Sequence, residues 1–180
     1  LDASAACQRI SGPEKWMESM KLQEEILSSK SVYEGRLLKV TEKAIRMPNG
    51  HQSTREIIEH PGAVTIIPIH DERVFLVRQF RSAAQKPLLE FPAGTLHIGE
   101  DPKLCAQREL EEEIGYQAKM WKPLFQGYVA PGYSSEVMHF FLAEELSRSK
   151  QNLDDDELIE VVDLPVRDLW KRVESGEIVD

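Results

Sequence analysis

The sequence predicts an α/β fold in which helices pack on both faces of a mixed β-sheet, that is, an α/β/α sandwich. Apolar segments typical of strands alternate with amphipathic segments typical of helices, in a mixed order. Turn residues such as Asn49-Gly50 and Pro61-Gly62 separate these segments, and Asn-Gly supplies the positive φ that a tight hairpin needs. A mixed order of this kind favours a layered α/β domain, and a chain of 180 residues is long enough for one.

Composition narrows the class of protein. The chain is 41 % hydrophobic and 29 % charged, which is typical of a globular protein. Its formal net charge of −9 argues against nucleic acid as a partner. Cys7 and Cys105 lack the spacing of a disulfide framework or a zinc site, so we expect a reducing, cytoplasmic location. No apolar run approaches 18 residues and no secretory signal is recognisable, so a membrane is not expected as a partner.

The N-terminal part is expected to comprise a flexible tail over residues 1–12, followed by a helix and a hairpin over residues 13–60. Pro13 suits the first turn of a helix. Apolar residues then recur near helical spacing at Trp16, Met20, Ile26 and Leu27. Alternating and β-branched residues predict a strand over Ser31–Met47, and a second strand follows Pro48-Asn49-Gly50 as far as His60.

Residues 61–180 are expected to form the main domain. Two apolar strands, Ala63–Ile69 and Arg73–Phe80, are joined at His70-Asp71-Glu72. Further strands are predicted at Leu124–Ala130, Val137–Ala143 and Leu158–Val162. A closing helix is predicted over Val166–Ser175.

The strongest helix signal follows Glu100. Asp101 is a good N-cap, Pro102 suits the first helical position, and Gly115 suits the position just after the helix. The segment between them, KLCAQRELEEEI, places Ala106, Leu110 and Ile114 on one face, which we expect to pack on the sheet.

The other face of this helix is acidic. Glu109 and Glu113 are four residues apart, so their carboxylates lie one turn apart, and Glu112 shares that face. Crowded carboxylates are natural ligands for Mg²⁺, for which Mn²⁺ can substitute. A merely solvated acidic face is the alternative. Arg108, flanked by glutamates, is expected to orient them by hydrogen bonds and not to touch phosphate.

The segment Gly94–Tyr116, GTLHIGEDPKLCAQRELEEEIGY, resembles the Nudix box. The residues that match the pattern are Gly94, Glu100, Arg108, Glu109, Leu110, Glu112, Glu113 and Gly115. Tyr116 departs from it, because the family usually has an aliphatic residue there. The resemblance implies the Nudix fold and metal ligation by the Ala93 carbonyl, Glu109, Glu113 and Glu112, with Glu100 behind these ligands.

Outside the box, the chain resembles the ADP-ribose pyrophosphatase branch of the family. Pro131 lies sixteen residues after Gly115, and the segments TREIIEHPGAV, LVRQFR and LLEFPAG are similar to that branch. The resemblance implies Mg²⁺-dependent hydrolysis of ADP-ribose to AMP and ribose 5-phosphate. It also implies a homodimer that exchanges N-terminal segments, which here would be the hairpin.

Other site residues are open to more than one interpretation. Arg55 and Arg81 are candidates for binding substrate, or else support strands from the surface. Glu90 is a candidate for reaching the metal cluster, or else is a solvated strand end. The acidic candidates for catalysis, and for the general base among them, are Glu157, Asp155, Glu136 and Glu112.

Two other functions compete with ADP-ribose hydrolysis. The first is hydrolysis of another bridged diphosphate, such as GDP-mannose, a different nucleoside-diphosphate sugar or FAD. The second is a module that binds nucleotide sugars without turnover, which the intact set of glutamates disfavours because a binding module does not need crowded carboxylates.

Overall fold

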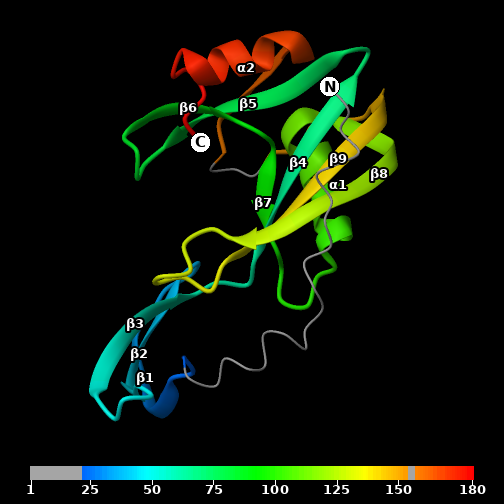
Figure 1. Cartoon of the computed structure of the whole chain (residues 1–180). Helices are drawn as coiled ribbons and strands as arrows, with labels where there is room; N and C mark the ends of the chain where they lie inside the picture. The colour runs from blue at the N-terminus through cyan, green and yellow to red at the C-terminus, as the bar shows by residue number, and fades with distance from the viewer. Residues whose placement is uncertain (1–21, 154–156) are drawn as a thin grey trace. The chain divides into compact units, whose positions relative to one another are not determined.

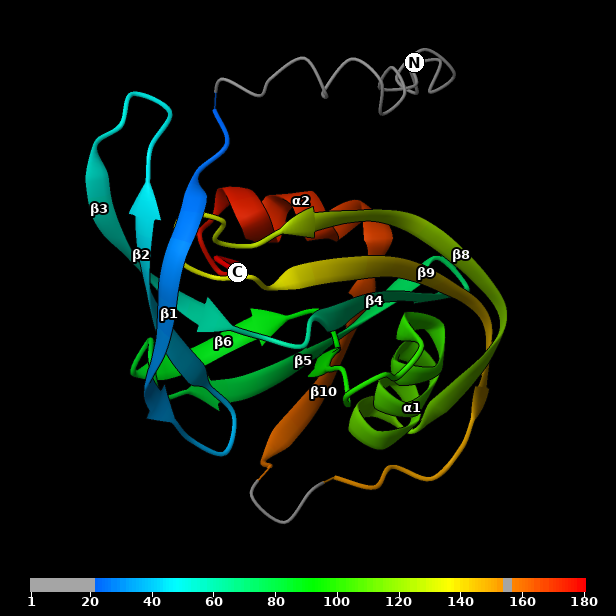
Figure 2. The same ribbon diagram turned by 90° about the horizontal axis from the view of Figure 1, so that it is seen from below.

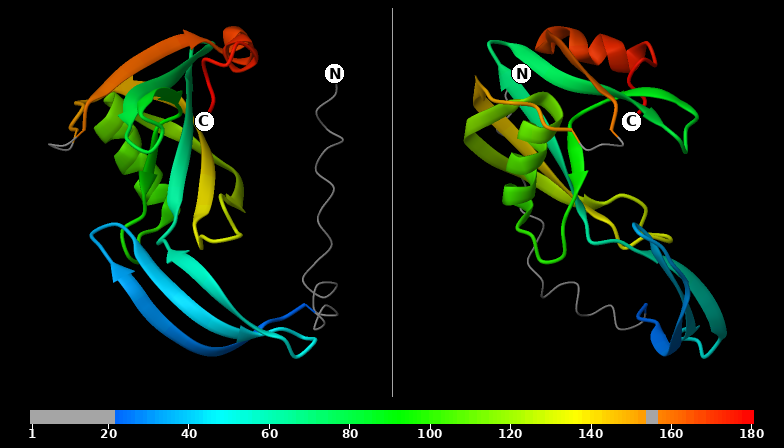
Figure 3. Two further views of the ribbon diagram at one scale, coloured as in Figure 1. Left: turned by 90° about the vertical axis from the view of Figure 1, so that its left-hand side faces the viewer. Right: turned by 180° about the vertical axis from the view of Figure 1, so that it is seen from behind.

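The computed structural model describes residues 22–153 and 157–180, which form two compact units that meet in sequence between Glu59 and His60. The first unit is an antiparallel sheet of β1 (Glu25–Glu34), β2 (Lys39–Arg46) and β3 (Gln52–Glu59), in that order. Figure 3 shows these three strands as a curved sheet. The predicted turn at Asn49-Gly50 joins β2 to β3, and Gly50 adopts a φ of 84° there.

The helix predicted from Pro13 onward is wrong where the structure describes it. Residues 25–30 belong to β1, which pairs with β2 along its whole length. Long-range strand pairing therefore overrides the helical spacing of Ile26 and Leu27. The predicted single strand Ser31–Met47 is also divided, because a turn closed by the Gly35 N–H and the Leu38 carbonyl separates β1 from β2. Residues 1–21, which include the predicted tail and the start of the predicted helix, lie outside the described residues.

The second unit is built on a seven-stranded mixed sheet. Its strands are β4 (Ala63–His70), β5 (Arg73–Arg81), β6 (Lys86–Glu90), β7 (Ala93–Thr95), β8 (Tyr116–Tyr128), β9 (Val137–Arg148) and β10 (Ile159–Pro165). The main order is β10-β5-β4-β9-β8, with β6 beside β5 and β7 beside β4. β4 and β9 run parallel and the other pairs run antiparallel. The five strands predicted in this unit are confirmed, although β8 begins earlier than predicted and ends at Tyr128, and β9 and β10 extend further than predicted.

Two helices cover opposite faces of this sheet, as the α/β/α prediction requires. Figure 2 shows α1 (Pro102–Ile114) and α2 (Val166–Glu174) on either side of the central strands. β5 serves both faces, because Phe75 and Val77 pack in the core cluster under α1, whereas Val74 and Leu76 pack in the cluster on the α2 side. Neither helix of the described residues has the length and apolar character needed to cross a bilayer.

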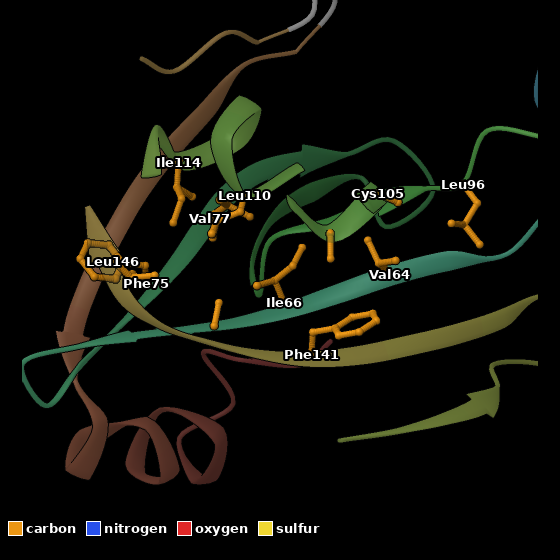
Figure 4. Close-up of a cluster of buried hydrophobic side chains, with 12 residues drawn as sticks. Val64, Ile66, Phe75, Val77, Leu96, Cys105, Leu110, Ile114, Phe141 and Leu146 are labelled. Carbon is orange, nitrogen blue, oxygen red and sulfur yellow. The ribbon is translucent and has the colours of Figure 1, made fainter. Parts of the chain in front are cut away.

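The caps and the apolar face of α1 are as predicted. Asp101 Oδ1 accepts hydrogen bonds from the N–H groups of Lys103 and Leu104, at 2.9 and 3.2 Å. At the other end Gly115 adopts a φ of 70°, in the left-handed region. The apolar face (Cys105, Ala106, Leu110 and Ile114) is almost completely buried against the sheet (Figure 4). These contacts hold the helix, and therefore its acidic face, in one position.

Strands β4 and β5 diverge beside α1. β4 and β5 pair only next to their shared turn, at Ile69–Val74 and His70–Arg73, and then diverge. Where they diverge, each pairs with a short strand, β5 with β6 and β4 with β7 (Figure 1). The acidic face of α1 lies next to β7, because the Ala93 N–H bonds Glu113 and a Cβ atom at Gly94 would meet Glu109.

Candidate active site

Gly94, in β7, leaves space for a carboxylate from α1. A Cβ atom at Gly94 would lie 1.9 Å from both Cδ and Oε1 of Glu109. No side chain can be accommodated at that distance, so the backbone of β7 and the Glu109 carboxylate approach each other only because residue 94 is glycine. The glycine of the predicted motif therefore sets the position of a predicted metal ligand.

Glu109 and Glu113 form a pair of buried carboxylates. Glu109 is 9 % exposed and Glu113 is 2 % exposed. Burial, together with the neighbouring charge of Glu109, raises the pKa of Glu113 to about 8, and burial also raises the pKa of Glu109. The Ala93 N–H donates a 3.0 Å hydrogen bond to Glu113 Oε2. The pKa of both carboxyl groups is raised in spite of their hydrogen bonds, so the pair fits a site that holds a cation.

Arg108 joins three glutamates. Its Nη1 donates to Glu109 Oε1 at 2.6 Å and to Glu112 Oε2 at 2.9 Å. Its Nε and Nη2 donate to Glu100, each at 3.2 Å. These hydrogen bonds lower the pKa of Glu100 to about 2, so Glu100 stays ionised and holds the guanidinium from behind. The contacts of Arg108 are those of a residue that orients carboxylates.

These residues line a pocket of about 320 Å³. Of the residues singled out from the sequence, the pocket brings together Arg81, Ala93, Gly94, Arg108, Glu109, Glu112, Glu113 and Glu157. Glu157 adds negative charge that contributes to the raised pKa of both Glu109 and Glu113. Sequence reasoning missed Gln79, Thr95, Leu96, His97 and Asn152, which also line the pocket. Among these, Thr95, Leu96 and His97 lie inside the predicted box. Their place in the box could have indicated that they line the pocket.

The donor set suits a hard divalent cation, although side chains alone do not complete its coordination. Among residues 22–153 and 157–180, no three Asp, Glu, His or Cys side chains converge closely enough to hold a metal ion. The reason is visible in the contacts, since Arg108 engages Glu109 and Glu112 while the Ala93 N–H engages Glu113. Mg²⁺ commonly uses only one or two carboxylates and fills its remaining positions with water and phosphate oxygens. The residues present therefore fit such an ion.

Glu90 lies behind the pocket and not on its wall. It is 4 % exposed, which excludes the alternative of a solvated strand end. Its carboxylate pairs with Arg81, with Nη2 and Oε2 2.7 Å apart, and it also accepts a 3.3 Å hydrogen bond from Gln79. Both partners line the pocket, so Glu90 holds Arg81 and Gln79 in place from the interior.

Two of the remaining candidates, Arg55 and Glu136, are absent from the lining of this pocket. Arg55 belongs to the N-terminal unit, where it contacts Glu24 and Ser53. Glu136 is absent from the described pocket lining, and one of its carboxylate oxygens lies 3.9 Å from His60 Nδ1. Asp155 lies outside the described residues.

Comparison with known proteins identifies the class. The NUDIX domain model matches residues 59–179, and the model of the nucleoside diphosphate sugar hydrolase N-terminal domain matches residues 24–58. The chain therefore belongs to the NUDIX family and is a Nudix hydrolase, which confirms the predicted family. Nudix hydrolases generally need divalent metal ions.

Individual relatives narrow the branch. The chain is 41 % identical to the ADP-ribose pyrophosphatase of Bacillus subtilis over 162 residues, which is 88 % of each protein. It is 34 % identical to the GDP-mannose pyrophosphatase of Escherichia coli K12 over 137 residues, covering 70 % of this chain and 71 % of that one. A solved structure described as an ADP compounds hydrolase superposes with a TM-score of 0.79 at 28 % identity, covering 88 % of each chain.

Proposed function

We propose that this protein is a Mg²⁺-dependent pyrophosphohydrolase that cleaves the diphosphate of a nucleoside-diphosphate sugar, with ADP-ribose as its substrate. The observation that carries the proposal is the pair of buried carboxylates, Glu109 and Glu113, beside a pocket bordered by Gly94. A binding module without turnover would have no use for two buried, mutually repelling charges. Similarity to ADP-ribose pyrophosphatase supports the choice of substrate.

Glu109, Glu113, Glu112 and the Ala93 carbonyl would hold the metal. Once bound there, a divalent cation neutralises charge on the diphosphate and lowers the pKa of an attacking water. Arg108 keeps Glu109 and Glu112 oriented through its 2.6 and 2.9 Å hydrogen bonds. Arg81, paired with Glu90, lines the same pocket, and we assign it to contact a phosphate oxygen of the substrate.

Among the acidic candidates that the structure describes, we assign Glu157 as the general base. It lines the pocket but lies outside α1, so it can take a proton without giving up a place in the metal-binding pair. A carboxylate oxygen of Glu157 accepts the proton as the water oxygen attacks phosphorus. The bond from that phosphorus to the bridging oxygen then breaks, and the products from ADP-ribose are AMP and ribose 5-phosphate.

A second substrate, GDP-mannose, is favoured by a specific observation, which is the similarity to GDP-mannose pyrophosphatase. Both substrates present the same diphosphate to the glutamates, and they differ in the base and the sugar. FAD is another bridged diphosphate of the same kind.

The experiment that identifies the substrate is a panel of ADP-ribose, GDP-mannose, other nucleoside-diphosphate sugars and FAD. Each compound is incubated with the protein and Mg²⁺, and the products are resolved by chromatography. We expect the highest kcat/KM for ADP-ribose, and a higher value for any other member would reassign the substrate.

We also propose a homodimer in the cytoplasm, without nucleic acid or membrane as a partner. The free, buried thiol of Cys105 suits a reducing compartment. The net charge of −9 repels a phosphate backbone. The N-terminal unit, which we assign to residues 13–60, is the segment we expect the two chains to exchange.

A further inference from the structure

A short segment after β9 closes the C-terminal end of α1. The last carbonyl groups of a helix have no partner within the helix and must find one elsewhere. Here residues 149–152 provide the donors. The hydrogen bonds run from the Ser149 N–H to the Gly115 carbonyl (2.8 Å), from Gln151 Nε2 to the Glu113 carbonyl (2.6 Å), and from the Asn152 N–H to the Glu112 carbonyl (3.1 Å). We call residues 149–152 the clasp.

The clasp is packed against the helix end as well as hydrogen-bonded to it. A Cβ atom at Gly115 would lie 3.0 Å from the Gln151 nitrogen and 3.3 Å from its Cβ, so the glycine makes room for the clasp. Ser149 Oγ also donates a hydrogen bond to Glu111, and this bond lowers the pKa of that exposed carboxylate. Main-chain and side-chain contacts together therefore fix the clasp on α1.

The clasp connects two parts of the pocket. Two of the carbonyls that it binds belong to Glu112 and Glu113, whose side chains line the pocket. Asn152, inside the clasp, lines the pocket as well. Five residues further along the chain comes Glu157, on the wall of the same pocket. Residues 149–152, which precede the assigned base in the chain, are thus hydrogen-bonded to the main chain of the assigned metal ligands.

We infer that Gln151 is a positioning residue, which holds the clasp against α1 and so keeps Asn152 and the base, Glu157, on the wall of the pocket opposite the metal-binding carboxylates. Gln151 supplies the one side chain of the clasp that bonds a carbonyl of α1, and its 2.6 Å bond to the Glu113 carbonyl is the shortest of the three. This inference rests on the function proposed above, in which Glu157 is the general base.

The first test compares two glutamine substitutions near the same helix end. Gln151→Met keeps the length of the side chain but removes its N–H donor. We expect it to lower kcat about tenfold, since small displacements of catalytic groups are costly, and to leave KM and Mn²⁺ affinity nearly unchanged. The matched control is Gln117→Met, which removes a 2.9 Å bond from β8 to Glu111 but leaves in place the three hydrogen bonds from the clasp to main-chain carbonyls, and which should keep the wild-type kcat. Equal kcat values for the two variants would overturn the inference.

A donor-restoring variant separates positioning from simple loss of stability. Lysine near a helix C-terminus can donate to the last carbonyls, so Gln151→Lys should recover most of the wild-type kcat. If Gln151→Met does not fold, Gln151→Ala, which removes the same donor, takes its place in the comparison. A folded Gln151→Lys protein with kcat lowered about tenfold would show that the hydrogen bond is not what matters.

A double-mutant cycle with Glu157→Gln asks whether Gln151 acts through Glu157. If it does, Gln151→Met should lower kcat about tenfold in the wild type and have little further effect in Glu157→Gln. The same tenfold loss in both backgrounds would overturn the inference while leaving Glu157 as the base. If Glu157→Gln alone keeps the wild-type kcat, the assignment of the base fails, and the inference fails with it.

Discussion

At the scale of single residues, the site depends on how closely two charged side chains are packed into the protein interior. Glu109 and Glu113 lie on the same helix as the buried apolar residues Leu110 and Ile114. Gly94 gives Glu109 its space, and the Ala93 N–H donates a hydrogen bond to Glu113. These residues therefore place two carboxyl groups where hydration cannot stabilise their charged forms, and a bound cation would stabilise those forms.

Replacing Gly94 tests this packing directly. In Gly94→Ala the new Cβ would lie 1.9 Å from the Glu109 carboxyl group, so the carboxylate must move. We expect Mn²⁺ affinity and kcat each to fall by about tenfold or more, as for other residues that orient metal ligands. Gly127→Ala is the matched control, because its Cβ would meet no atom within 4 Å. A Gly94→Ala enzyme with wild-type Mn²⁺ affinity would show that the position of Glu109 does not matter.

The raised pKa of Glu113 predicts how the stability of the metal-free protein depends on pH. Burial and the charge of Glu109 raise this pKa from about 4.5 to about 8. Between these values the folded state binds a proton on Glu113 and the unfolded chain does not, so the free energy of unfolding falls as pH rises. We expect the Tm of metal-free wild type, measured with a chelator, to fall between about pH 5 and about pH 8. Glu113→Gln should fall less steeply, and parallel Tm profiles would contradict the assignment.

At the scale of elements, helix α1 could be predicted and strand β1 could not. The ends of α1 are determined by local chemistry, namely the Asp101 cap, Pro102 and the left-handed Gly115, and local chemistry can be recognised in sequence. β1 is a strand because it pairs with residues 39–46, and its apolar residues remain exposed, so periodicity carries little information about it. The burial of Glu90 was missed for a similar reason, since it depends on Arg81 in the neighbouring strand.

The division of roles between α1 and the segment after β9 gives another prediction. Glu157 lines the pocket from outside α1, so Glu157→Gln should lower kcat by about a hundredfold and leave Mn²⁺ affinity nearly unchanged. Glu109→Gln should weaken Mn²⁺ binding as well, because it removes an assigned ligand. Mn²⁺ titration and steady-state assays on each variant provide the comparison. If Glu157→Gln keeps its kcat while Asp155→Asn or Glu136→Gln loses it, the base is that other residue.

At the scale of the whole molecule, the pocket combines segments that are distant in sequence. Its walls come from β5, from β7 and the turn after it, from α1, and from residues 152 and 157. The sequence motif identifies Ala93 and Gly94 of β7 and the glutamates of α1, because these residues belong to the box or directly precede it. Gln79 and Asn152 could not be predicted, since they reach the pocket only through strand pairing and the hydrogen bonds of the clasp.

The N-terminal unit predicts the oligomeric state. Only Thr41 and Ile45 are buried among the residues of its three strands, while Ile26, Val32 and Tyr33 of β1 are exposed. A small sheet with so little core of its own needs another surface to be stable. We expect a homodimer by light scattering at micromolar concentration, and deletion of residues 1–60 should abolish both the dimer and activity. A fully active monomer would refute this prediction.

The most direct measurement is the rate of ADP-ribose hydrolysis with and without a divalent metal. Wild-type protein and Glu113→Gln are treated with chelator and assayed before and after addition of Mg²⁺, with AMP and ribose 5-phosphate quantified by chromatography. Because Glu109 and Glu113 are assigned as metal ligands, we predict that activity is lost with the metal and restored by Mg²⁺ in the wild type. Glu113→Gln, folded by circular dichroism, should have a kcat lower by about a hundredfold or more. Full hydrolysis by the chelator-treated wild type would contradict the metal-dependent site.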